Sequence, residues 1–105
     1  MLAFSQESLE VSICHAIRQQ RRVSVSHRGR ERVVEPYLLF ETKDGGMTLH
    51  AWQVSGQWSK TPPPDWCDIS LADVEWVELL GERFEQPNPG YSPESDRFHR
   101  VICKV

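Results

Sequence analysis

Two turn signals divide residues 23–54, VSVSHRGRERVVEPYLLFETKDGGMTLHAWQV, into three short segments. Before the first turn, His27–Arg30, apolar and polar residues alternate, which is the period of a half-buried strand. The second turn, Lys43–Gly46, combines an aspartate with two glycines, a composition typical of the tight connection in a β-hairpin. The pattern therefore predicts three successive strands, at residues 23–26, 32–40 and 47–54.

The residues on either side of this segment complete the predicted elements. Leu9, Ile13 and Ile17 recur at helical spacing and Ser5 is a suitable N-cap, so a helix is expected over residues 5–20. Further strands are expected at residues 67–69, 74–80 and 98–105. One helix followed by five or six short strands indicates a mainly β protein with a small, strongly bent sheet or barrel.

Individual positions in these strands carry more specific expectations. Pro36 cannot donate a hydrogen bond to a neighbouring strand, so it marks an edge or a bulge. Met47 and Leu49 alternate with polar residues and are expected to share one face. Trp76 alternates with Val74 and is expected to lie in the core.

The length of 105 residues corresponds to one domain, with the helix at about 5–20, the barrel at about 22–80 and a C-terminal extension at about 81–105. No apolar run approaches the ~18–20 residues that span a bilayer, and no secretory signal is visible. A cytoplasmic location is therefore expected. The three cysteines, Cys14, Cys67 and Cys103, form no CxxC pair and are expected to be reduced and buried.

The net charge of −3 hides an asymmetry along the chain. Residues 1–32 hold six arginines against three glutamates, whereas the remaining residues hold six basic and twelve acidic side chains. Such a division is typical of a polyanion-binding face on an otherwise acidic body, and equally of a solvated helix end beside ordinary strand charges.

The order of elements resembles the WYL domain, a bacterial module with an Sm-like or SH3-like barrel that usually follows a helix-turn-helix in transcription regulators. The segments that carry the resemblance are Ala16–Ile17 with Val23–His27, Arg32–Pro36, Met47–Leu49, Ile69–Val74, Phe84–Tyr91 and Phe98–Val105. His27 stands where the family pattern has a tyrosine, and Ser70 and Asp73 stand where it has arginines. The resemblance implies an Sm/SH3-like barrel of five to six strands in a short, standalone member of the family.

The same resemblance implies a regulatory module that senses a ligand, including single-stranded nucleic acid, and signals to a partner protein. The residues before the barrel provide one helix and no helix-turn-helix, so sequence-specific binding of duplex DNA is not expected.

The candidate binding residues surround the first turn. Arg28, Arg30 and Arg32 alternate along the chain, and the planar guanidinium group suits phosphate recognition. We expect these three side chains to hold phosphates, with base stacking from Tyr37 and Trp52 and pH-sensitive hydrogen bonds from His27 and His50. The alternative is a solvated hairpin in which Glu31, Glu35 and Glu41 neutralise the arginines.

Four tryptophans are many for this length and support a second hypothesis of a different class. Trp58 and Trp66 bracket a proline-rich loop, and Trp52 shares a face of its strand with His50. If the pair of Trp52 and His50 is exposed, it would suit a protein-interaction or homodimerisation module with no small ligand. The alternative is that the helix or the tail buries this pair.

The motifs expected of an enzyme or a metal protein are missing from the sequence. There is no G-x-S-x-G, P-loop or H-E-x-x-H pattern, and no catalytic residues are predicted. His99 and Cys103 are four residues apart in a predicted strand, where their side chains would not converge on a metal. The sequence therefore predicts a non-enzymatic protein with no metal site and no cofactor.

Overall fold

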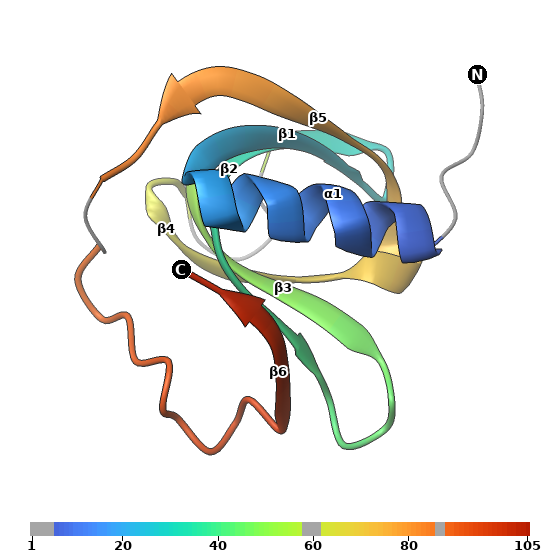
Figure 1. Ribbon diagram of the computed structural model, residues 1–105. Coiled ribbons are helices and arrows are strands. Elements are labelled where there is room, and N and C mark those ends of the chain that lie inside the picture. Colours follow the sequence, from blue (N-terminus) through green and yellow to red (C-terminus); the bar gives the residue numbers. More distant parts are fainter. Residues whose placement is uncertain (1–5, 58–61, 86–87) are drawn as a thin grey trace.

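The computed structural model describes residues 6–57, 62–85 and 88–105 (Figure 1). Its elements in chain order are α1 (Gln6–Gln19), β1 (Arg21–His27), β2 (Arg30–Glu41), β3 (Met47–Gly56), β4 (Asp65–Ser70), the 3-10 helix η1 (Leu71–Asp73), β5 (Val74–Arg83) and β6 (Arg100–Lys104). The predicted N-terminal helix and mainly β character are confirmed. Ser5, the expected N-cap, and Trp58 lie outside the described residues.

The strands form one antiparallel sheet in the order β4-β3-β2-β1-β5, and β6 pairs with β2. The long strand β2 changes neighbours along its length, because β1 pairs with residues 30–34 and β6 with residues 38–41. Pro36 lies between these pairings, beside a register shift against β3, which confirms the expected bulge. Figure 1 shows a strongly curved sheet, with α1 packed across it in contact with β1, β2, β5 and β6.

The connection between β1 and β2 is as tight as the sequence predicts. Its two central residues, Arg28 and Gly29, have positive φ angles of 53° and 76°, the combination required by a type I′ hairpin turn. Glycine adopts this conformation without strain, and the turn brings His27 directly opposite Arg30 in the ladder. The hairpin therefore places His27, Arg28, Arg30 and Arg32 at one end of the sheet.

Two apolar clusters lie on opposite faces of β2 and β3. The main core contains the buried face of α1 and the residues Val23, Val25, Val34, Leu39, Met47, Leu49, Ala51, Ile69, Leu71, Val74 and Val77. The shared face of Met47 and Leu49 is thus confirmed as a core face. A second group, here called the tail cluster, contains Tyr37, Leu38, Phe40, Phe84 and Phe98, with Trp52, Trp66 and Tyr91 packed against it.

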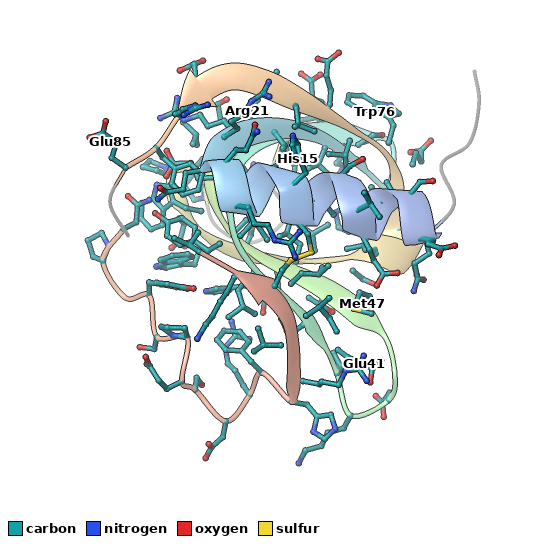
Figure 2. The ribbon with its side chains drawn as sticks, in the orientation of Figure 1. His15, Arg21, Glu41, Met47, Trp76 and Glu85 are labelled. Carbon is teal, nitrogen blue, oxygen red and sulfur yellow. A yellow bond between two sulfur atoms is a disulfide. The ribbon has the colours of Figure 1, made fainter. Side chains whose placement is uncertain are left out.

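The expected core position of Trp76 is wrong, because Trp76 is only partly buried while Val74 and Val77 are the buried residues of β5. The register between β1 and β5 shifts at Ser26, so that one step along β1 is matched by two steps along β5. This bulge breaks the two-residue alternation and puts the buried side chains three residues apart. Figure 2 shows Trp76 at the outer side of β5.

The expectation that all cysteines are reduced is also wrong. Cys14 of α1 and Cys103 of β6 form a disulfide with a Cα–Cα distance of 5.8 Å, seen as the yellow bond beside α1 in Figure 2. Cys67 is the free cysteine. The bonded residues are 89 positions apart, and only the packing of α1 against β6 brings them together. Spacing along the chain carries no signal of that contact.

Candidate anion-binding site

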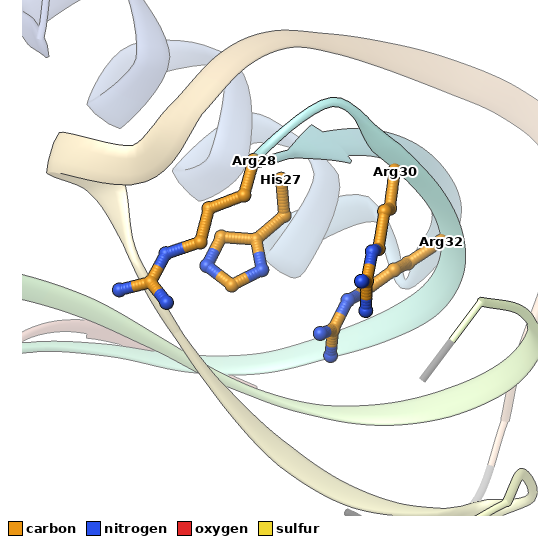
Figure 3. A pocket seen from close by; sticks show the side chains of 4 residues that line it. All are labelled: His27, Arg28, Arg30 and Arg32. Carbon is orange, nitrogen blue, oxygen red and sulfur yellow. The ribbon is translucent and has the colours of Figure 1, made fainter. Parts of the chain in front are cut away.

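The hairpin between β1 and β2 lines a cavity of about 320 Å³ with four basic side chains, His27, Arg28, Arg30 and Arg32. Arg30 and Arg32 are two residues apart on β2 and therefore lie on the same face. Figure 3 shows the ring of His27 between Arg28 on one side and the Arg30 and Arg32 side chains on the other. The structure thus brings together all three arginines that the sequence singles out, and it adds one of the two candidate histidines.

Arg32 is the most unusual of these residues, because only 6% of it is exposed. Its Nη1 donates to Oε1 of Gln53 at 3.3 Å, while its buried Nε has no hydrogen-bond partner in the part of the chain that the structure describes. No carboxylate pairs with it among those residues. A guanidinium that is withdrawn from water without a counter-charge carries a large desolvation cost, which a bound anion would offset.

The cysteine next to Arg32 does not supply that counter-charge. Burial raises the pKa of the Cys67 thiol to about 11, and this effect outweighs the opposing influence of the neighbouring Arg32. Cys67 is therefore neutral at physiological pH and provides no negative charge to pair with the guanidinium of Arg32.

The other two arginines stand at the rim of the cavity and differ in their partners. Arg28 pairs with Asp73 of η1, with Nη2 and Oδ2 3.0 Å apart. Arg30 is exposed and makes no hydrogen bond or ion pair within residues 6–57, 62–85 and 88–105. Glu31, Glu35 and Glu41 pair with none of the three arginines in this part of the chain. Arg28 is neutralised by Asp73 instead, whereas Arg30 and Arg32 have no carboxylate partner among the described residues.

His27 is half-buried against the same carboxylate, with Nε2 3.9 Å from Oδ2 of Asp73. Burial lowers the pKa of His27, the nearby Arg32 lowers it further, and Asp73 partly opposes both effects. The ring consequently favours its neutral form in the unliganded protein, in which one ring nitrogen is a donor and the other is an acceptor.

The residues expected to add stacking or polar contacts lie elsewhere. Tyr37 is completely buried and belongs to the tail cluster, and Trp52 packs against this cluster. His50 is nearly completely buried and its ring contacts Phe98 of the same cluster. His50 and Trp52 alternate with Leu49 and Ala51 along β3, so they face away from the main core. The predicted grouping of these three aromatic residues with the arginines is therefore wrong.

Their contacts are those of packing residues. The Tyr37 hydroxyl accepts hydrogen bonds from the backbone N–H and the side-chain amide of Asn88, each at 2.9 Å. The His50 ring stacks on Trp66 with centroids 4.7 Å apart, and Trp52 meets Trp66 edge to face at 5.2 Å. These rings are engaged with one another and are not available as a stacking surface beside the cavity.

Two residues at the site were not predicted to function there. Gln53 is buried beside Arg32, because it is two residues from Ala51 and shares the core face of β3. A polar side chain on an apolar face is a signal of a buried polar partner. Asp73 closes the S-x-x-D turn of residues 70–73 and comes close to Arg28 and His27 only after folding. Gln53 was thus detectable from the sequence, whereas the role of Asp73 depends on a long-range contact.

Comparison of the chain with models of protein families, with curated proteins and with solved structures found no significant match in any of the three. Among the described residues, no helix has the length and hydrophobicity that crossing a membrane requires. The same residues contain no group of three or more histidine, cysteine or acidic side chains placed to hold a metal ion.

Proposed function

We propose that this chain is a non-enzymatic regulatory module that binds a phosphate-bearing ligand at the hairpin cavity and signals to a partner protein. The observation that carries the proposal is the buried guanidinium of Arg32, which lines a cavity together with Arg30, and neither arginine has a carboxylate partner among the residues that the structure describes. Single-stranded nucleic acid and phosphorylated small molecules present the same chemistry to such a site. Phosphate oxygens satisfy several N–H groups at once through charge-assisted hydrogen bonds.

The overall charge argues for a local site and against a general polyanion-binding surface. The protein carries a net charge of −3, so non-specific attraction to nucleic acid is weak. The arginines of the cavity, by contrast, present a local positive potential inside a hollow that partly excludes water. A ligand therefore has to place its phosphate within the hollow, and adsorption to the outer surface is not sufficient.

The link between Arg28 and Asp73 gives the site a route to the rest of the fold. The turn is held to η1 by the hydrogen bond from the Arg28 N–H to the Asp73 carbonyl, 2.9 Å long, and to β5 by the Gly29 N–H, which donates to Glu75 at 2.8 Å. A phosphate that competes for the Arg28 side chain weakens its pairing with Asp73. We propose that the resulting adjustment of η1 is the change that a partner protein detects.

We further propose that the curved sheet is an Sm/SH3-like barrel of the WYL type. The support is the sheet order, which puts β4 and β5 at opposite ends while η1 alone connects them along the chain. The strong curvature in Figure 1 brings these two ends towards each other around the main core.

The proposal is tested by titrating the protein with a labelled single-stranded oligonucleotide at low and moderate salt. We expect binding that weakens with salt, because phosphate contacts release counterions. The R30Q/R32Q double variant should lose about 100-fold in affinity, on the basis of ~1–3 kcal/mol for each charge-assisted contact. R100Q is the matched control, because Arg100 is an exposed arginine on β6, away from the hairpin. Binding that is absent at about 50 µM protein, or that does not respond to salt, would refute the proposal.

The alternative of a homodimerisation module has less support from the structure. It rests on the tryptophans, yet Trp52 and Trp66 are packed against each other and against the tail within one chain. Sedimentation equilibrium distinguishes the two functions. A stable dimer that W52A dissociates would favour the interaction module, and a monomer that binds the oligonucleotide would exclude it.

A further inference from the structure

His27 occupies the centre of the proposed phosphate site, between arginines that come from different parts of the hairpin (Figure 3). Arg28 of the turn and Arg30 and Arg32 of β2 face it, together with Asp73 of η1. Cys67 of β4 lies beyond Arg32 as a neutral thiol. Glu75 of β5 is also near the turn, where it accepts hydrogen bonds from the Gly29 N–H and the Ser26 hydroxyl.

We propose that His27 makes phosphate binding at this cavity pH-dependent, by taking up a proton when the ligand binds. The inference rests on the proposed function and specifies its regulation. In the unliganded protein, partial burial and the guanidinium groups of Arg32 and Arg28 oppose an additional positive charge on the ring. A bound phosphate reverses the sign of the local potential, so that the imidazolium gains a counter-charge and a second N–H donor for the phosphate oxygens.

The direction of the effect follows from thermodynamic linkage. Since the ligand favours the protonated ring, protonation favours the ligand by the same factor, and affinity rises as the pH falls. The unliganded pKa lies below the usual value because burial, Arg32 and Arg28 outweigh Asp73. The increase therefore occurs at and below neutral pH, with a limit of about tenfold per pH unit for one proton.

The test uses an oligothymidylate 12-mer, because the charge of its phosphodiesters is constant between pH 6 and pH 8. Affinity is measured by calorimetry at both pH values for the wild-type protein and for H27Q. We expect the wild-type affinity to rise about three- to tenfold at pH 6 relative to H27Q, whose affinity should follow only the small change in overall charge. H99Q is the matched control, since His99 is exposed and distant from the hairpin in the chain.

A second measurement is independent of any variant. Calorimetry in two buffers with different ionisation enthalpies reports the protons taken up on binding, and NMR of the His27 ring reports its pKa with and without the oligonucleotide. We expect a net uptake of a fraction of a proton near pH 6.5 and a higher pKa in the complex. Binding that is equally tight at both pH values without proton uptake would overturn this inference alone. Absence of salt-dependent binding at either pH would remove the proposed function and this inference together.

Discussion

A buried basic side chain lies in each of two regions, Arg32 at the cavity of the β1–β2 hairpin and His50 beside the tail cluster. The two side chains differ in whether a carboxylate of the chain pairs with them. Beside the tail cluster, Asp68 accepts a hydrogen bond from His50 at 2.7 Å and from Nη1 of Arg97 at 2.8 Å. The Arg97 guanidinium also lies over the Phe98 ring, 4.4 Å from its centroid. In the cavity, Arg32 has no such partner among the described residues. This difference is the basis for our proposal that the cavity takes an external anion, whereas the polar groups beside the tail cluster satisfy one another within the chain.

The largest expected effect concerns Glu35, a buried carboxylate that attaches the tail to the sheet. Its side chain is 8% exposed, pairs with Arg22 at 3.0 Å and accepts a hydrogen bond from Asn88 at 2.7 Å. We expect E35Q to lower the free energy of unfolding by about 2 kcal/mol, because it removes the buried negative charge that Arg22 and Asn88 contact and leaves Arg22 with the exposed Glu82 as its carboxylate partner among the described residues.

Glu82 provides a matched control, since it pairs with the same arginine at 2.8 Å but its side chain is 70% exposed. E82Q should cost less than about 0.5 kcal/mol, as surface ion pairs usually do. Urea unfolding of the two variants measures the difference. Equal losses of unfolding free energy in E35Q and E82Q would show that burial does not determine the strength of these two ion pairs.

A smaller effect is expected at Asp68. Burial raises the pKa of this carboxyl group, but the hydrogen bonds from His50 and Arg97 outweigh burial and lower the pKa to about 2. Because the folded-state pKa lies below the unfolded value, Asp68 stabilises the protein above about pH 4, and this contribution is lost as the pH falls through 2. D68N should therefore lower the free energy of unfolding by about 1 kcal/mol at pH 7, a value reduced for the partial exposure of the group.

Urea unfolding at pH 7, 4 and 2.5 measures this contribution. The difference between the wild-type protein and D68N should be constant from pH 7 to pH 4 and should shrink at pH 2.5. A difference that remains unchanged at pH 2.5 would show that the charge on Asp68 does not support the tail. D44N is a control, because Asp44 is exposed in the turn between β2 and β3.

Local patterns predicted the residues of the cavity but not those of the tail cluster. The arginines lie on alternate residues of one tight hairpin, so alternation along β2 and the turn signal were sufficient to place Arg30 and Arg32 on one face. The tail cluster instead joins Tyr37 and His50 to residues 88–98, and the sequence carries no signal for that long-range packing. The same limitation explains the Cys14–Cys103 disulfide. Trp76 was misplaced because a β-bulge interrupts the two-residue period of its strand.

The smallest expected change in stability is at Arg32, and it is measured against Arg97 to compare the two regions directly. Arg32 at the cavity and Arg97 beside the tail cluster are each replaced with methionine. R97M removes the ion pair with Asp68 and the contact with Phe98, and it should cost about 1 kcal/mol, limited by the exposure of Arg97. R32M removes a buried charge that lacks a carboxylate partner among the described residues and leaves an apolar side chain in its place. The lost hydrogen bond to Gln53 offsets part of the gain, so the stability should be unchanged or higher by up to about 1 kcal/mol.

Thermal and urea unfolding of the unliganded variants distinguish these signs, and the oligonucleotide titration completes the test. R32M should lose about tenfold or more in affinity while retaining full stability, whereas R97M should lose stability and retain affinity. If R32M is instead destabilised as much as R97M, Arg32 is a structural residue whose charge the fold itself satisfies. The cavity would then no longer require an anion to compensate it, because the cost that a ligand is proposed to relieve would already be met within the chain.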